Sequence, residues 1–310
     1  MEQPELETDG YSKGNWKPYP YSPSFEAAIV FVALFGLATI YLIYQVLKAL
    51  SRNETNKRDK RFLWMMVPFI LGGSLETFGY TARVVLSFDI TNIRPYIAQK
   101  LLLLFASPLY AVTLYMSLGS LVELLECQKI SFMPIKLLIM IFVIGDLFSF
   151  LVQLAGGVIV ASGTIRTGQY IINSGLIVQT LFLGLFMIVA LTFYHRAVKY
   201  PNEYIMIMRN IPSQFNNWNS IFIAILACST LLLTRCISRL IEAVQGERGY
   251  LISHEIFLYS LDASLMFINM IVFMSQDIGK YCLIFQTYLP YVDRSEDLNT
   301  TIVHKNYLFY

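Results

Sequence analysis

The sequence is poor in charged residues. Aspartate, glutamate, lysine and arginine make up 14% of its 310 residues, against about 25% in a typical soluble domain. The net charge is only +2 and the basic residues are scattered, which argues against nucleic acid as a partner. With 56% hydrophobic residues and a mean hydropathy of +0.55, the composition indicates that lipid is the main solvent of this chain.

Cysteine is scarce and lacks any metal-binding pattern. The four residues Cys127, Cys228, Cys236 and Cys282 show no CxxC spacing, so we predict neither a disulfide framework nor a zinc site. Small buried thiols explain them best, and acylation of Cys127 or Cys282 is the alternative. We also predict no cleavable signal peptide, because residues 1–25 are polar, acidic and rich in proline and tyrosine.

Catalytic signatures are absent from the sequence. There is no HExxH, GxSxG or P-loop pattern, so we predict a non-enzymatic protein without catalytic residues, cofactor or metal. Because no segment suits a nucleotide, any transport has to be driven by a gradient, by mass action or by a partner. One enzymatic alternative stays open, a metal-dependent lipid hydrolase that uses His254, Glu255 and Asp262.

What the sequence does contain is long apolar runs. A bilayer core of about 30 Å needs roughly 20 apolar residues as a helix, and only helices or closed barrels satisfy the backbone in lipid. The alternation typical of a membrane barrel is missing. We therefore predict an all-α, polytopic fold with seven transmembrane helices, at 26–50, 62–86, 96–121, 135–159, 169–194, 218–240 and 254–276.

The loops between these segments predict the orientation. Loop 51–61 holds five basic residues and loop 195–217 holds three, whereas the alternate loops hold one each. By the positive-inside rule the N-terminus lies outside and the C-terminus in the cytosol. Residues 1–25 would then form an extracytoplasmic tail, 26–276 the transmembrane domain and 277–310 a cytosolic tail of a multi-pass protein.

Polar residues recur within the apolar segments at helical spacing. Intramembrane charge costs about 2.5–3.5 kcal/mol per residue on insertion scales, so each such group needs a partner or a purpose. Residues three, four and seven apart share one helix face. The candidate substrate-binding residues selected in this way are Glu76, Tyr80, Arg83, Gln99, Asp146, Gln153, Gln179, Arg235, Arg239, Glu242, Glu255, Tyr259 and Asp262.

With the predicted orientation, these groups converge on the outer half of the bilayer, and Asp146 lies nearer its middle. One interpretation is a buried ion-pair network that fixes helix register, with Glu76 on Arg83, or Arg235 and Arg239 on Glu255 and Asp262. The other is a polar cavity open toward the outer leaflet. Such a cavity suits an amphiphile, whose head lies in the cavity and whose tail lies in the bilayer. We also expect Pro108 to kink its helix and the glycine pairs to permit close helix packing.

The chain resembles the fungal lipid-translocating exporter family, also called RTA-like after a yeast aminocholesterol-resistance protein. The resemblance rests on "YSPS" at 21–24, "ETFGYTAR" at 76–83, "QKLLLLFASPLYAVTLYMSLG" at 99–119, "GDLFSFLVQLAGG" at 145–157, "GQYIINSGLIVQTLFLGLF" at 168–186 and "RCISRLIEAVQGERGYLISHEIFLYSLD" at 235–262. These pieces fall in the family's order and cover about residues 20–280. The thirteen candidate residues above all coincide with family-typical positions.

The resemblance implies a fungal protein of the plasma membrane or endomembranes that exports or translocates amphiphiles. Our first hypothesis is a translocator of sphingoid long-chain bases or sterol-like compounds, with a link to drug resistance and stress response. Carboxylates would bind the ammonium and glutamines the hydroxyls. The alternatives are a seven-helix stress sensor that changes lipid asymmetry indirectly, and a porphyrin or haem transporter. Beyond an amphiphilic lipid and the bilayer, the sequence indicates no partner and no oligomeric state.

Overall fold

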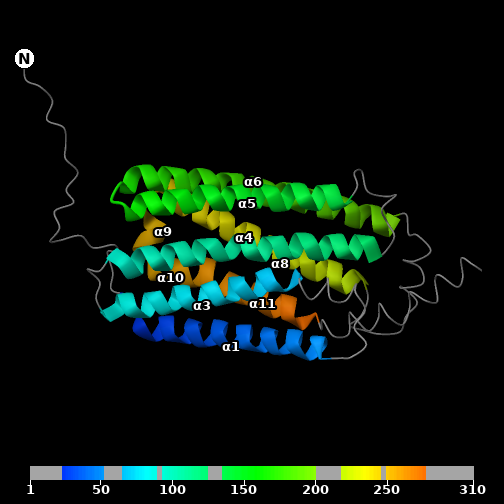
Figure 1. The fold of residues 1–310 in the computed structure, drawn as a ribbon, viewed down its shortest axis with the longest axis horizontal. Coiled ribbons are helices and arrows are strands. Elements are labelled where there is room, and N and C mark those ends of the chain that lie inside the picture. The colour runs from blue at the N-terminus through cyan, green and yellow to red at the C-terminus, as the bar shows by residue number, and fades with distance from the viewer. Residues whose placement is uncertain are drawn as a thin grey trace, which may run out of the picture.

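The computed structural model describes residues 23–51, 65–88, 93–124, 135–199, 218–245 and 249–276, and every regular element within these ranges is helical. The predictions for the two tails, for most residues of the basic loops, and for Cys127 and Cys282 lie outside the described residues. Figure 1 shows the long helices lying side by side in one elongated bundle.

The long helices confirm the predicted segments to within about five residues. They are α1 Phe25–Leu50, α3 Val67–Phe88, α4 Ile93–Leu124, α5 Ile135–Ala161, α6 Ile165–Lys199 and α8 Trp218–Gln245. Helix α4 continues through Pro108. The end of the bundle where α1 begins and where α3, α5 and α8 finish is called the first end below (Figure 1, left).

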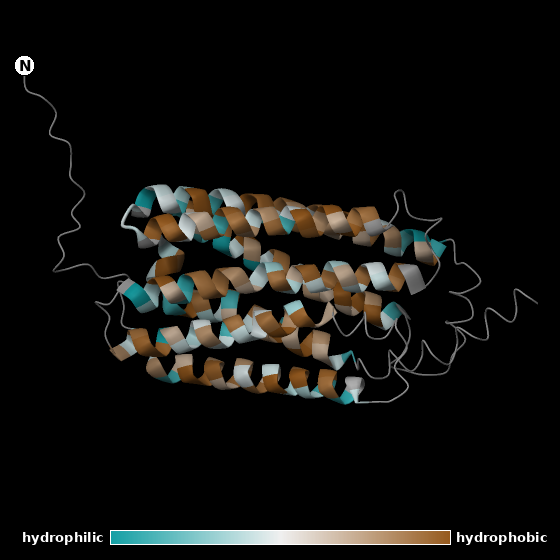
Figure 2. Ribbon diagram, viewed as in Figure 1, coloured by the Kyte–Doolittle hydropathy of each residue, from teal (hydrophilic) through white to brown (hydrophobic). Residues whose placement is uncertain are grey.

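Six helical stretches are long and apolar enough to cross a membrane: Phe25–Lys48, Arg94–Val122, Leu137–Val160, Arg166–Lys199, Asn219–Gln245 and Glu255–Ser275. Helix α3 is not among them, because Glu76, Arg83 and its glycines lower its hydropathy, although it packs between α1 and α4. Large apolar side chains such as Leu37, Leu181 and Ile188 are exposed on the outside of the bundle, and Figure 2 shows how apolar most helix surfaces are. The chain is an integral, multi-pass membrane protein.

The last predicted segment, 254–276, is helical from Glu255 to Ser275, but it is not one continuous α-helix. It consists of α10 Glu255–Leu258, the π-helical segment η2 Tyr259–Ala263 and α11 Ser264–Ser275, preceded by the short α9 Tyr250–Ser253. A π turn holds one extra residue and often occurs at functional sites. Here it contains Asp262, which is 3% exposed. The break in α-helical register therefore changes the direction in which Asp262 points.

The glycine residues of α5 and α6 let these helices approach backbone to backbone, as predicted. A Cβ atom at Gly156 would lie 2.8 Å from the carbonyl oxygen of Gly168 and 2.9 Å from the amide nitrogen of Ile172. Backbone atoms cannot move aside as a flexible side chain can. Small residues are the usual means of such close packing in membranes.

Replacing Gly156 by alanine should therefore separate the two helices and lower stability by about 1–3 kcal/mol, the usual effect of overpacking. Thermal unfolding of the purified protein in detergent measures this. The matched control is Gly184→Ala on α6, where an added Cβ meets no atom within 4 Å. That variant should be at least as stable as the wild type, because alanine favours a helix over glycine by about 1 kcal/mol. Equal effects of both substitutions would contradict the packing argument.

Candidate functional site

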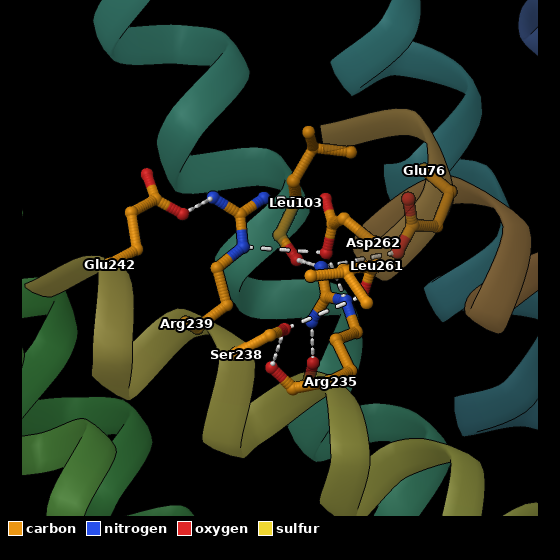
Figure 3. Close-up of polar contacts among 9 residues, drawn as sticks. Glu76, Leu103, Arg235, Ser238, Arg239, Glu242, Leu261 and Asp262 are labelled. Atoms are coloured by element: carbon orange, nitrogen blue, oxygen red, sulfur yellow. Dashed lines mark hydrogen bonds and ion pairs between the residues drawn. The ribbon is translucent and has the colours of Figure 1, made fainter. Parts of the chain in front are cut away.

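The centre of the candidate site is a pair of arginines from α8 that both bind Asp262 of η2 (Figure 3). Arg239 donates from Nη2 to Oδ2 of Asp262 at 2.5 Å and from Nε to Oδ1 at 3.3 Å. The Nε of Arg235 forms an ion pair with Oδ1 of the same carboxylate. Because the arginines are four residues apart, they share one face of α8. The π turn presents Asp262 between them.

Arg235 extends this network to α3 and α4. Its Nη2 donates to the carbonyl oxygen of Leu103 at 2.7 Å and lies 3.6 Å from Oε1 of Glu76, while Nη1 donates to the hydroxyl of Ser107. Ser107 directly precedes Pro108, whose missing amide leaves a backbone carbonyl of this turn without its helical donor. One guanidinium therefore joins three helices to η2 through four contacts, which suits the fixed fork geometry of arginine.

The network opens toward the first end. There Arg239 donates from Nη1 to Oε2 of Glu242 at 3.0 Å. The side chains of Arg239 and Glu242 are 13% and 22% exposed, whereas Glu76 is completely buried. Neither carboxylate oxygen of Glu76 has a hydrogen-bond partner among the described residues. The network therefore contains three carboxylates: Asp262 is tightly bound, Glu242 lies at the rim, and Glu76 is buried but weakly held.

A second polar group lies nearer the first end, between α1, α3 and α10. Arg83 donates from Nη2 to Glu255 at 2.7 Å and from Nε to the hydroxyl of Tyr259 at 3.0 Å. The same Oε1 of Glu255 accepts the backbone amide of Ser24 at 2.9 Å. Tyr259 stacks on Phe31 of α1. These contacts hold the start of α1 against the last transmembrane segment.

The third polar group lies between α4, α5 and α6. Gln153 of α5 donates from Nε2 to Oε1 of Gln179 of α6 at 2.9 Å. Asp146 of α5 is buried beside the hydroxyl of Tyr115 of α4, and neither of its carboxylate oxygens has hydrogen-bond geometry with a described residue. Gln99 of α4 is also buried with both amide atoms unpartnered in the described structure.

The candidate residues therefore lie together in the bundle but form three groups rather than one. The predicted pairing of Arg235 and Arg239 with Asp262 is confirmed, but their predicted pairing with Glu255 was wrong, because Glu255 binds Arg83. The predicted pairing of Glu76 with Arg83 was wrong, because a separation of seven residues is about two helical turns; Arg83 reaches Glu255 instead, and Glu76 faces Arg235. Tyr80 completes the set: it is buried in an aromatic stack with Phe31, Phe35 and Tyr259.

A small pocket lies at the rim of the arginine network. It has a volume of about 30 Å³ and is lined by Ser238, Arg239, Glu242, Leu251, Ile252, Phe257, Leu258, Leu261 and Asp262. That volume is close to the share of one water molecule and far below the roughly 300–1,000 Å³ of ligand sites. In this conformation the charges neutralise each other rather than line a lipid-sized pocket at this place.

The residues proposed for a metal-dependent hydrolase do not come together. The Nδ1 of His254 lies 3.0 Å from the backbone oxygen of Tyr250, Glu255 binds Arg83 and Asp262 binds the arginines. Across the described ranges no three metal-ligating side chains form a cluster. Cys228 and Cys236 are buried free thiols.

Sequence reasoning missed three contributors to the site: the Leu103 carbonyl, the Ser24 amide and the Tyr115 hydroxyl. The first two are backbone groups, which carry no sequence signal. Tyr115 is one of 20 tyrosines, and its position seven residues after Pro108 gives no indication of a carboxylate neighbour on another helix.

The fold and the site define a class: an all-helical, multi-pass membrane protein whose core contains a buried ionic network. The chain belongs to the family described as RTA1 like protein, whose model matches residues 69–283. That match spans all three polar groups, apart from the Ser24 amide.

Several curated relatives come from Saccharomyces cerevisiae. The protein named Protoporphyrin uptake protein 1 is 34% identical over 82% of this chain and 90% of its own length. Protein RTA1 is 32% identical over 85% of each chain. Sphingoid long-chain base transporter RSB1 is 25% identical over 79% of this chain and 69% of its own. No solved structure matches the chain significantly. The names of these relatives support a role in membrane transport rather than catalysis.

Proposed function

We propose that this protein translocates amphiphilic lipids with a charged head group, with sphingoid long-chain bases as the first substrate class. The observation that supports this most is the arginine network of α8 and η2, whose rim residues Arg239 and Glu242 border a pocket between polar and apolar walls. One relative, RSB1, is named as a sphingoid long-chain base transporter, which points to this substrate class. The apolar outer surface of the bundle suits a tail that remains in the bilayer.

In this proposal the head group enters by exchanging partners. The ammonium of a long-chain base would compete with Arg239 for the carboxylates of Glu242 and Asp262, and the displaced guanidinium would swing toward the rim. Because the pocket holds only about 30 Å³, entry requires α9 and α10 to move away from α8. The proposed head-group residues are those of the first two polar groups together with the adjacent Tyr80: Glu76, Arg83, Arg235, Arg239, Glu242, Glu255, Tyr259 and Asp262.

A porphyrin is the second candidate, because the relative named for protoporphyrin uptake is 34% identical over 90% of its length. A porphyrin carries carboxylates rather than an ammonium. It would therefore bind the guanidinium groups of Arg235 and Arg239 and displace Asp262. The same network would accommodate a cationic or an anionic head group. A cationic head group displaces Arg239, and an anionic one displaces Asp262.

We further propose that α3 spans the membrane together with the six apolar stretches, which makes seven spans with the N-terminus outside and the C-terminus in the cytosol. Its 22 residues are long enough. Its polar side chains face neighbouring helices, since Glu76, Tyr80 and Arg83 are all buried. The plasma membrane is the proposed location.

This orientation predicts that neither glycosylation sequon carries a glycan. Asn53-Glu54-Thr55 and Asn299-Thr300-Thr301 both lie on the proposed cytosolic side, where no glycan is attached. Treatment of the expressed protein with an endoglycosidase should leave its mobility on a gel unchanged. A sequon engineered into the tail at residues 1–20 is the positive control and should be glycosylated. Glycan on either native site would reverse the orientation.

Vesicles containing only the purified protein test the proposed function. A labelled long-chain base, a labelled phospholipid and a porphyrin are added to one leaflet, and their movement to the other is followed over time. A translocator moves at least one of them faster than protein-free vesicles do. A sensor that acts indirectly moves none. The variant Glu255→Gln should slow the base in the same assay, and a folded variant with wild-type rate would contradict the role of that carboxylate.

A further inference from the structure

The third polar group stands apart from the arginine network and has a different chemical character. It consists of Gln99 and Tyr115 on α4, Asp146, Ser149 and Gln153 on α5, and Gln179 on α6. All are buried. No cationic side chain belongs to this group. Its one acidic residue, Asp146, forms no ion pair within the described part of the chain.

Among the described residues, no positive charge next to Asp146 balances an ionised carboxylate. From α4 the titratable neighbour is Tyr115, and from α8 it is the thiol of Cys236. From α6 the neighbours are aromatic, because Phe182 packs against Gly145 and Phe186 packs against Tyr115. In such surroundings a lone carboxylate is strongly disfavoured, and the group becomes compatible with the membrane by binding a proton.

A line of buried polar atoms leads from Asp146 toward the first end. Asp146, Ser149 and Gln153 are three and four residues apart and share one face of α5. The side-chain oxygen Oε1 of Gln153 and both side-chain amide atoms of Gln99, Oε1 and Nε2, are buried without hydrogen-bond partners among the described residues. Buried polar atoms of this kind are normally satisfied, often by water. The line therefore places buried polar groups between Asp146 and the first end.

Asp146 of α5 lies beside Tyr115 of α4 and interacts electrostatically with the thiol of Cys236 of α8. Tyr115 belongs to α4, which supplies Leu103 and Ser107 to Arg235. Cys236 directly follows Arg235 on α8. A change of charge on Asp146 therefore acts on the two helices that hold the guanidinium in place.

We propose that Asp146 is a proton-binding site through which the transmembrane proton gradient drives the movement of the substrate. The carboxylate takes up one proton from one side of the membrane and releases it to the other, with no other bond made or broken. The inference rests on the proposed function, because it supplies the energy for that translocation. It explains how a chain without a nucleotide-binding segment can accumulate a substrate.

The experiment uses the full-length protein in vesicles and a long-chain base with a permanently charged trimethylammonium head. Such a probe cannot cross as a neutral amine, so a pH gradient alone does not redistribute it. At equal pH on both sides the protein should equilibrate the probe. With a one-unit pH difference, exchange of one proton for one cation should give about a tenfold concentration ratio at steady state. A ratio of this kind does not depend on the transport rate.

In Asp146→Asn vesicles the steady-state ratio should fall to one, whereas Asp146→Glu should retain a ratio well above one. If the wild type moves neither this probe nor any other lipid tested at equal pH, the proposed function is refuted. Movement at equal pH with a ratio of one under the gradient would refute only the proton coupling. A ratio that follows an imposed sodium gradient, or a wild-type ratio in Asp146→Asn, would likewise overturn it.

A second measurement keeps the inference testable if Asp146→Asn transports nothing. Infrared difference spectra of the protein recorded across a pH titration should contain the carbonyl band of a carboxylic acid that gains or loses its proton. The band should be missing in Asp146→Asn and present in Glu76→Gln, which removes the other carboxyl that is buried without a hydrogen-bond partner in the described ranges. A wild-type band that persists in Asp146→Asn would place the titrating proton elsewhere and overturn the assignment.

Discussion

Replacing Asp262 by asparagine is expected to lower the stability of the protein more than any other single substitution at the site. The carboxylate is 3% exposed and binds Arg235 and Arg239 simultaneously. Asparagine has nearly the same shape but leaves the buried guanidinium of Arg235 and the mostly buried one of Arg239 with two carboxylates, Glu76 at 3.6 Å from Arg235 and Glu242 at the rim. Breaking a buried ion pair by removing one partner costs about 3–5 kcal/mol. Thermal unfolding in detergent and the amount of protein reaching the membrane measure the effect.

The double variant Asp262→Asn with Arg239→Gln separates lost charge balance from lost shape. It removes one of the two unpaired cations, so it should be more stable than Asp262→Asn alone, even though it carries a further substitution. Pairs within one network are coupled rather than additive. If Asp262→Asn unfolds at the wild-type temperature, or if the second substitution adds its own full destabilisation, the two arginines do not depend on this carboxylate.

The helices and their polar faces were predictable because they depend on local periodicity. The period of 3.6 residues placed Glu76, Tyr80 and Arg83 on one face of α3, and all three are buried. The same reasoning marked α8 as the helix that carries the arginines, and the apolar runs gave the ends of α1 and α5 to within two residues. Such features belong to one segment at a time.

Partner choice across helices was less predictable, because it depends on rotation and depth in the bundle. Arg83 could not be assigned to Glu255 without the position of α10, which is 172 residues further along the chain. The π turn at Tyr259–Ala263 changes the direction of Asp262 by adding a residue to one turn, and no residue pattern in "YSLDA" marks it. The separation of Asp146 from the arginines likewise appears only when α4, α5 and α8 are packed together.

The substrate's charge should be revealed by Glu242 and Arg239, the two rim residues of the arginine network. They are three residues apart on α8, bind each other at 3.0 Å and are both partly exposed. Neutralising either one leaves the pair of Asp262 with Arg235 intact. The variants Glu242→Gln and Arg239→Gln therefore change the charge of neighbouring rim positions in opposite directions; Glu242→Gln keeps the shape of the side chain, and Arg239→Gln also shortens it.

If the substrate is a cationic long-chain base, Glu242→Gln should slow its translocation about tenfold, because a hydrogen bond to a charged group contributes about 1.5–3 kcal/mol. Arg239→Gln should leave the rate equal or raise it, since the arginine competes with the ammonium for Asp262 and Glu242. An anionic porphyrin should give the reverse order. Initial rates in vesicles, measured for both probes with both variants, provide the comparison. Equal rates for the two variants with every transported probe would mean that the head group does not pass the rim of this network.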